Sequence, residues 1–77
     1  MNNKIAVSLL EALGGKENIR ALEHCATRLR IVVKEDANVD VETIKKINKV
    51  AGYFLQSGQH QVILGTGLVN AVHTEMT

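Results

Sequence analysis

The chain has 77 residues, which is enough for one domain with one modest hydrophobic core. Hydrophobic residues make up 45% of it and charged residues 22%, a balance typical of a soluble globular domain and not of a disordered chain. The net charge of +1 and the aromatic share of 3% argue against a nucleic-acid or anionic-membrane partner, so any anion binding must come from locally placed arginines.

Cysteine usage and apolar runs indicate the compartment. Cys25 is the one cysteine, so the chain forms no internal disulfide and needs no oxidising environment. No apolar run approaches the roughly 18 residues of a membrane-spanning helix, and the N-terminus does not resemble a signal peptide. These features predict a cytoplasmic domain.

The first predicted element is an amphipathic helix over residues 3–13. Its apolar residues recur at spacings of one, three and four and form one stripe: Ile5, Ala6, Leu9, Leu10 and Leu13. Asn3 is a candidate N-cap. Gly14 and Gly15 end the helix, because glycine adopts the left-handed cap conformation at little cost.

Two predicted strands then flank Cys25. Residues 19–23 fit either a short strand or the end of a helical turn, and we favour a strand because a clear strand follows and needs a partner. Residues 27–34 alternate with the period of two that is typical of a half-buried strand. Cys25 would therefore sit at a tight strand-to-strand turn.

The alternation in the second strand divides its side chains between two faces. Leu29, Ile31 and Val33 fall on one face, and Arg28, Arg30 and Val32 fall on the other. We expect the apolar set to meet the core. Both arginines would then lie together on the opposite face, beside the turn that holds Cys25.

Another helix, two strands and a last helix complete the chain. Asp40 is the predicted N-cap of a helix that runs to about residue 48. Residues 51–56 and 61–64 are predicted strands, and Thr66 is a candidate cap for a helix that follows.

The order α-β-β-α-β-β-α predicts the fold class. Strands joined in pairs by short turns form an antiparallel sheet, and the apolar face of such a sheet needs a cover. We expect an α+β two-layer sandwich, with a four-stranded antiparallel sheet and three helices on one face. Residues 1–77 would form this single domain.

Cys25 is the candidate nucleophile. A lone cysteine is often a small buried hydrophobe, but a turn flanked by His24 and Thr27 favours an accessible thiol. Nearby arginine favours the thiolate, which is the nucleophilic form. A phosphoryl group on the sulfur would bring about two negative charges, which the guanidinium groups of Arg28 and Arg30 are suited to receive.

The other polar candidates each have an ordinary alternative. The arginine pair could be the solvated face of a one-sided sheet. His24 and His60 could be bases, proton shuttles or phosphate acceptors, or simply surface or turn histidines, and His73 carries less information still. The GxG stretch at residues 65–67 could hold an anion or merely end a strand and cap a helix. One cysteine and three scattered histidines predict no metal site.

Three stretches carry a resemblance to a known family: GGKENI at residues 14–19, HCATRLR at 24–30 and GQHQVILGT at 58–66. The chain resembles the EIIB domain of the glucose/sucrose superfamily of the bacterial phosphoenolpyruvate-dependent sugar phosphotransferase system (PTS). The likeness covers nearly the whole chain, and its Cys-x-Thr-Arg-Leu-Arg core is far more specific than a lone GxG. The family fold that it implies is again a four-stranded antiparallel sheet with three helices.

The resemblance implies a phosphoryl carrier, that is, a protein-phosphocysteine–sugar phosphotransferase that needs no cofactor. In the family, the cysteine accepts a phosphoryl group from a phosphohistidine on an EIIA domain. It then passes the group to a sugar held by a membrane-embedded EIIC domain during import. Cys25 falls on the phosphocysteine position, and Arg28 and Arg30 fall on the arginines associated with transfer to the sugar.

Further positions carry over with less weight. Ala26 and Thr27 fall in the turn that receives the phosphate, and Thr27 helps to shape it. Gln61 and His24 are candidate accessory residues. Glu23 stands where some members carry aspartate, and it is assigned no role.

The resemblance also implies a cellular setting. We expect the chain to be one domain of a longer sugar permease, placed at the cytoplasmic face of the bacterial membrane, with the isolated domain monomeric. The residues around Cys25 and over 58–66 look closer to the sucrose, trehalose and β-glucoside branches than to the glucose branch.

Two other classes stay open from the residues alone. One is a non-catalytic regulatory or binding module with an inert thiol. The other is a thiol redox protein, which would need an external resolving thiol because the chain has no second cysteine. Nucleic-acid binding is the least favoured class.

Overall fold

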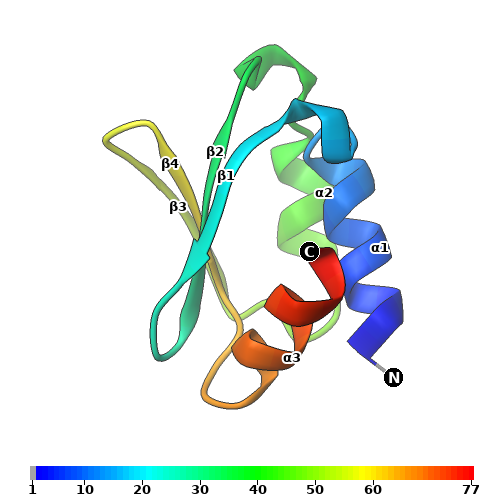
Figure 1. Ribbon diagram of the computed structural model, residues 1–77, viewed down its shortest axis with the longest axis vertical. Helices are drawn as coiled ribbons and strands as arrows, with labels where there is room; N and C mark the ends of the chain where they lie inside the picture. Colours follow the sequence, from blue (N-terminus) through cyan, green and yellow to red (C-terminus); the bar gives the residue numbers. More distant parts are fainter. Residues whose placement is uncertain (1) are drawn as a thin grey trace.

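A four-stranded antiparallel sheet forms one layer of the protein, and three α-helices lie together on one of its faces (Figure 1). The computed structural model describes residues 2–77, with side chains from residue 4 onward. The elements in chain order are α1 (Asn2–Ala12), the 3-10 turn η1 (Lys16–Asn18), β1 (Ile19–His24), β2 (Arg28–Val33), the 3-10 turn η2 (Asp36–Asn38), α2 (Val41–Lys46), β3 (Gly52–Gln56), β4 (Gln59–Ile63) and α3 (Leu68–Met76). The predicted α+β sandwich and its element order are confirmed.

The sheet order β1-β2-β4-β3 places the two hairpins side by side. Strands β2 and β4 are central and pair antiparallel, with Leu29 opposite Val62 and Arg30 opposite Gln61. Strands β1 and β3 form the edges. The strand that follows the Cys25 turn therefore lies in the middle of the sheet, with neighbours on both sides.

The core lies between the sheet and the helices. The alternation in β2 is confirmed, because Leu29 and Ile31 are fully buried while Arg30 is exposed. The buried apolar residues come from every helix and from the central strands: Ala6, Leu9, Ala12, Leu13, Leu29, Ile31, Val33, Ile44, Val62, Leu64, Val69, Val72 and Met76. Burial of this one cluster is the main stabilising contribution to the fold.

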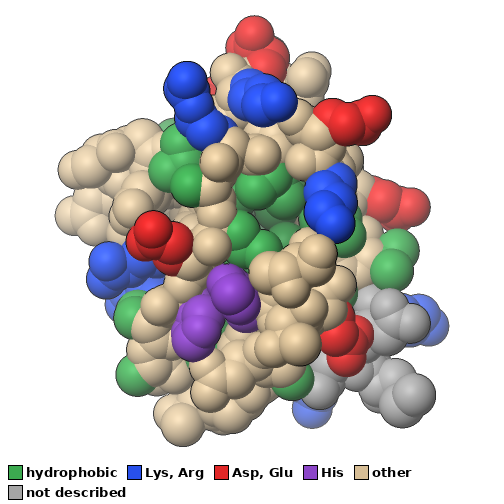
Figure 2. Space-filling model, in the orientation of Figure 1, with side chains coloured by type: hydrophobic (Ala, Val, Ile, Leu, Met, Phe, Trp, Pro, Cys, Tyr) green, Lys and Arg blue, Asp and Glu red, His purple; other side chains and the backbone are tan. Residues whose placement is uncertain are grey.

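Charged side chains of both signs lie on the face of the protein that Figure 2 shows. Basic and acidic side chains are interspersed on the face shown in Figure 2, in agreement with the net charge of +1. None of the helices within residues 2–77 is long and apolar enough to cross a membrane.

The helix α2 is capped as predicted but ends early. The side chain of Asp40 accepts hydrogen bonds from the backbone N–H of Thr43 at 3.1 Å and from its hydroxyl at 2.7 Å. The helix stops at Lys46 and not near residue 48, because Ile47 takes an extended conformation with ψ 131°. This conformation lets Ile47 pack against the core.

Other element ends differ from the sequence predictions. Thr66 does not cap α3: the N-cap residue is Gly67, at φ 85°, and it makes no side-chain cap bond. This left-handed backbone turns the chain into the helix one residue later than predicted. Strand β4 begins at Gln59, two residues before the predicted residue 61. The predicted cap Asn3 has a side chain that lies outside the described part of the structure.

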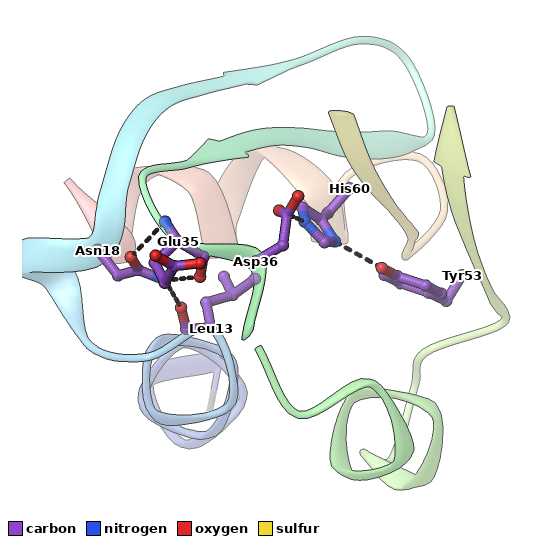
Figure 3. A network of polar contacts seen from close by, with 6 residues as sticks. All are labelled: Leu13, Asn18, Glu35, Asp36, Tyr53 and His60. Carbon is purple, nitrogen blue, oxygen red and sulfur yellow. Dashed lines mark hydrogen bonds and ion pairs between the residues drawn. The ribbon is translucent and has the colours of Figure 1, made fainter. Parts of the chain in front are cut away.

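A buried asparagine ties the start of the sheet to α1 (Figure 3). Asn18 is 6% exposed, and its amide N–H groups donate to the carbonyl oxygens of Leu13 at 2.7 Å and Glu35 at 3.1 Å. The backbone N–H of Glu35 donates to the side-chain oxygen Oδ1 of Asn18 at 3.0 Å. The chain just after α1 is thereby joined to the segment just after β2 through one side chain.

His60 belongs to a second polar network (Figure 3). The sequence interpretation of His60 as a surface or turn residue is wrong, because its side chain is only 2% exposed. Its Nδ1 lies 2.5 Å from the Tyr53 hydroxyl and its Nε2 lies 2.9 Å from an Asp36 carboxylate oxygen. Since the carboxylate only accepts, this network is satisfied when His60 carries its proton on Nε2 and accepts from Tyr53 at Nδ1.

Candidate active site

The turn between β1 and β2 holds Cys25, Ala26 and Thr27. The backbone N–H of Cys25 donates to the carbonyl oxygen of Arg28 at 3.0 Å, which closes the hairpin. The carbonyl oxygen of Thr27 accepts from the N–H groups of Leu64 and Gly65, each at 2.9 Å. The turn is therefore fastened to β2 and to the end of β4, and Cys25 lies at the strand-to-strand turn where the sequence placed it.

The surroundings of the Cys25 thiol favour its ionised form. The pKa of Cys25 is lowered chiefly by a hydrogen bond from the backbone N–H of Thr27. Partial desolvation opposes this change, whereas the backbone N–H of Arg28 and the guanidinium of Arg30 lower the pKa further. Cys25 is partly exposed, so this nucleophilic sulfur is accessible at the surface.

The sheet face that points away from the helices gathers the polar candidates. The strand register places Glu23 opposite Arg30, Arg30 opposite Gln61, and Gln61 opposite Phe54. Directly paired residues of antiparallel strands project to the same face. Arg30, Gln61 and Phe54 therefore form one row across this open face, and Arg28 lies on the same face two residues along β2.

The two arginines have different surroundings. Arg28 is half-buried, its Nη1 donates to Gln61 Oε1 at 2.7 Å, and its guanidinium carbon lies 5.9 Å from the centre of the Phe54 ring. Arg30 is exposed, and its guanidinium charge lowers the pKa of Cys25. The structure thus brings three of the predicted site residues, Arg28, Arg30 and Gln61, together on one face, beside the turn that holds Cys25.

His24 lies apart from this group. It pairs with Leu29 and so projects toward the helix side of the sheet. Its ring centre lies 4.4 Å from that of His73, and histidine side chains gather at one spot on the face in Figure 2. Its link to the turn is a contact of 3.4 Å between Nδ1 and the carbonyl oxygen of Cys25. The imidazole of His24 therefore does not join the arginines.

Phe54 is a neighbour of the site that the sequence analysis missed. A signal was available, because the turn at Ser57 and Gly58 sets the hairpin register that pairs Phe54 with Gln61. As for metals, no group of three or more His, Cys, Asp or Glu side chains within residues 2–77 is placed to hold an ion.

The comparisons with known proteins bear on this geometry. The family model for the phosphotransferase system, EIIB, matches residues 8–40. The crystal structure of one domain of the PTS system IIabc component from Clostridium difficile matches with a TM-score of 0.89 and 46% identity, covering 96% of this chain and 77% of that one. The chain belongs to the EIIB family. The resemblance read from residues 14–19, 24–30 and 58–66 is thereby confirmed.

Curated relatives of this EIIB domain are longer proteins. It is 52% identical over 67 residues to the sucrose-specific EIIBC component of Bacillus subtilis (strain 168), covering 87% of this chain and 14% of the relative. It is 54% identical over 70 residues to the sucrose-specific EIIBC component of Klebsiella pneumoniae, covering 91% and 15%. For the trehalose-specific EIIBC component of Bacillus subtilis (strain 168) the values are 46% over 74 residues, 96% and 16%. The chain thus spans about one seventh of the length of these relatives.

Proposed function

We propose that this EIIB domain carries a phosphoryl group on Cys25, taking it from a phosphohistidine of an EIIA domain and passing it to a sugar held by a membrane-embedded EIIC domain. The observation that carries the proposal is the thiol of lowered pKa at an accessible turn, with two guanidinium groups on the adjoining sheet face. Membership of the EIIB family supports the same assignment.

The first transfer loads the sulfur. The Cys25 thiolate attacks the phosphorus of the phosphohistidine, an S–P bond forms, the N–P bond breaks, and the imidazole leaves with its electron pair. Because the nucleophile is the thiolate, the N–H groups of Thr27 and Arg28 raise the reactive fraction near neutral pH. The same donors lie next to the incoming phosphoryl oxygens, where a tight turn suits an anion.

The second transfer unloads it. A sugar hydroxyl oxygen attacks the phosphorus, an O–P bond forms, the S–P bond breaks, and the thiolate leaves with its electron pair while the hydroxyl proton is released to solvent. Charge on the three equatorial phosphoryl oxygens needs positive partners in this step. We assign this task to Arg28 and Arg30, with Gln61 holding Arg28 and with Ala26 and Thr27 forming the turn.

The longer EIIBC relatives support a membrane-bound setting. We propose that the domain works as part of a sugar permease at the cytoplasmic face of the bacterial membrane, and that it is monomeric when isolated. We further propose a sugar of the sucrose or trehalose class. The site lies at an accessible turn, which suits successive, transient contacts with a donor domain and an acceptor domain.

A reconstituted relay tests the proposal. The chain is incubated with phosphoenolpyruvate, Enzyme I, HPr and an EIIA of a sucrose or trehalose system, and its intact mass is measured. We expect a phosphate-sized increase that maps to Cys25 and is lost in Cys25→Ser, while His24→Gln takes up phosphate as the native chain does. An unchanged mass with every such EIIA, or an increase that persists in Cys25→Ser, would overturn the proposal. Reversible oxidation without phosphate uptake would indicate a thiol redox protein instead.

A further inference from the structure

We infer that Phe54 is a positioning residue for phosphoryl transfer: its ring, together with the Gln61 side chain, seats the guanidinium of Arg28 on the open sheet face. This inference rests on the proposed function and deepens it. It assigns a role to an exposed aromatic residue and separates the task of Arg28 from that of Arg30.

The contacts of Phe54 point to Arg28 and not to the core. The side chain is 52% exposed and lies on the face opposite the helices, so it contributes little to the buried cluster. The Arg28 guanidinium carbon lies 5.9 Å from the ring centre, within the range of a cation–π interaction. Gln61, which is paired with Phe54 across the hairpin, accepts from Arg28 Nη1 at 2.7 Å.

Gly52 is a neighbour of the Phe54 ring on β3, and a Cβ added there would make ordinary van der Waals contacts only. In the strand register Arg28 is opposite Ile63, and Ile63 is opposite Gly52, so these three positions form the row next to that of Phe54. A Cβ placed on Gly52 would lie 3.8 Å from the Phe54 ring. The ring therefore leans over the position where β3 carries no side chain, which is toward the row of Arg28.

The groups that contact the Arg28 guanidinium are uncharged, which suits an arginine that must bind phosphate. Among the described residues, no carboxylate lies within ion-pair distance of Arg28. An amide oxygen and an aromatic face orient the guanidinium without cancelling its charge, whereas a carboxylate would compete with the phosphoryl oxygens. One N–H of Arg28 is occupied by Gln61, and the remaining donors of the fork stay available.

The expected effect of Phe54 is modest and specific to one step. A cation–π contact at an exposed site corresponds to a change of about two- to fivefold in an equilibrium or a rate. Replacing the ring should slow transfer from Cys25 to the sugar by that factor, because Arg28 then samples other orientations. Loading of Cys25 from EIIA should change by less than about twofold, because the thiol is tuned by Thr27, Arg30 and the Arg28 backbone.

The first test measures the contact between the Phe54 ring and the Arg28 guanidinium. In the isotope-labelled native chain, we expect the Arg28 Nε–H resonance to be displaced by the ring current of Phe54. The displacement should vanish in Phe54→Leu, which keeps apolar volume but removes the ring, and persist in Phe54→Tyr. Leu55→Ala is the matched control, because Leu55 is 56% exposed on the same strand but faces the other side. An Arg28 resonance that is the same in native and Phe54→Leu chains would overturn the inference.

The second test measures the two transfers separately. Each variant, once thermal unfolding has shown it to be folded, is loaded through EIIA, and the loss of its phosphoryl group to saturating sugar is followed in EIIC membranes in a single turnover. We expect Phe54→Leu to slow only this transfer, about two- to fivefold, with Phe54→Tyr and Leu55→Ala close to native. Equal transfer rates in native and Phe54→Leu chains would overturn the role of Phe54 and leave the proposed function standing. The same conclusion would follow if Leu55→Ala slowed the transfer as much as Phe54→Leu does. A native chain that takes up no phosphate would overturn the proposed function, and the role of Phe54 with it.

Discussion

Gln61 holds Arg28 across the two central strands, with Arg28 Nη1 donating to Gln61 Oε1 at 2.7 Å. Gln61 is 7% exposed and Arg28 is half-buried, so the bond is partly shielded from water, which strengthens a hydrogen bond to a charged group. Arg30 is exposed instead, and its guanidinium charge lowers the pKa of Cys25. The side chain of Arg28 is thus held in place by a hydrogen bond to Gln61, whereas the side chain of Arg30, two residues further along β2, remains exposed to solvent.

Changing Gln61 to glutamate should separate stability from activity. In Gln61→Glu the carboxylate still accepts from Arg28, so we expect the free energy of unfolding to change by less than about 1 kcal/mol. Transfer from phosphorylated Cys25 to sugar should fall about tenfold, because the new charge neutralises Arg28. Urea denaturation and single-turnover transfer measure the two quantities. Gln56→Glu makes the same charge change at an exposed position of β3, and transfer as slow in that variant would contradict the assignment.

Removing the charge of Arg30 should change the ionisation of Cys25. The Arg30 guanidinium lowers the pKa of Cys25, so in Arg30→Gln the pKa rises and the alkylation rate reaches its plateau at a higher pH. The rate of iodoacetamide labelling against pH measures the midpoint. Arg20→Gln removes an exposed charge from β1 and should leave the midpoint unchanged.

Arg28→Gln provides an internal comparison for that experiment. Arg28 lowers the pKa of Cys25 through its backbone N–H, which the substitution keeps. We therefore expect a smaller rise of the midpoint than in Arg30→Gln. A larger rise in Arg28→Gln than in Arg30→Gln would show that the two arginines have been assigned the wrong tasks.

Asn18 should be one of the least replaceable polar residues. Asn18→Ala leaves the carbonyl oxygens of Leu13 and Glu35 and the N–H of Glu35 without this partner, which should lower the free energy of unfolding by about 2–3 kcal/mol. Asn18→Asp should be at least as harmful at pH 7, because a carboxylate would face two carbonyl oxygens. Urea denaturation measures both, with the exposed Asn70→Ala as control. A native-like stability of Asn18→Asp would contradict this account.

The hydroxyl of Tyr53 should stabilise the fold only below its own ionisation. Tyr53→Phe leaves the buried Nδ1 of His60 without a donor and should cost about 1–2 kcal/mol at pH 7. Partial burial, and then the Asp36 carboxylate, raise the pKa of Tyr53. A raised pKa in the folded state means that the stabilisation is complete below the ordinary tyrosine pKa of 10.0 and is lost as the pH rises through the higher folded value.

The pH dependence supplies the control for that variant. The stability difference between native and Tyr53→Phe chains, measured by urea denaturation from pH 7 to 11, should be constant at first and then shrink. A difference that stays constant across this range would show that the hydroxyl of Tyr53 does not act through its proton. Leu55→Ala on the same strand should show no such trend.

The spacing of apolar residues predicted the helices and strands, because the buried side chains of each element recur with the period of that element. The alternation around Leu29 and Ile31 named the buried face of β2, and Asp40 was identified as a cap from its position before an apolar run. Thr66 failed as a cap because Gly67, with its left-handed backbone, starts the helix in its place. Residue type favoured threonine there, but the backbone conformation at the next position decided the outcome.

The polar interior was less predictable. His60 alternates with Val62 on the core face of β4, yet histidine has only an intermediate tendency to be buried. Its burial here depends on a hydroxyl from β3 and a carboxylate from η2. Asn18 likewise joins α1 to the end of β2. Hydrogen-bond partners that come from other segments of the chain cannot be recognised from the residues adjacent to His60 or Asn18.

The sequence by itself determined the element order, the buried face of β2, the turn that holds Cys25 and, through HCATRLR at residues 24–30, the family. These depend on spacing within a few residues, which local geometry translates directly into a face or a turn. Only the tertiary structure decided that Gln61 and Phe54 flank Arg28, that the Arg30 charge lowers the pKa of the thiol, and that the ring of His24 lies on the other side of the sheet. Those contacts depend on the register between strands that are far apart in the chain, which is set when the whole sheet packs against its helices.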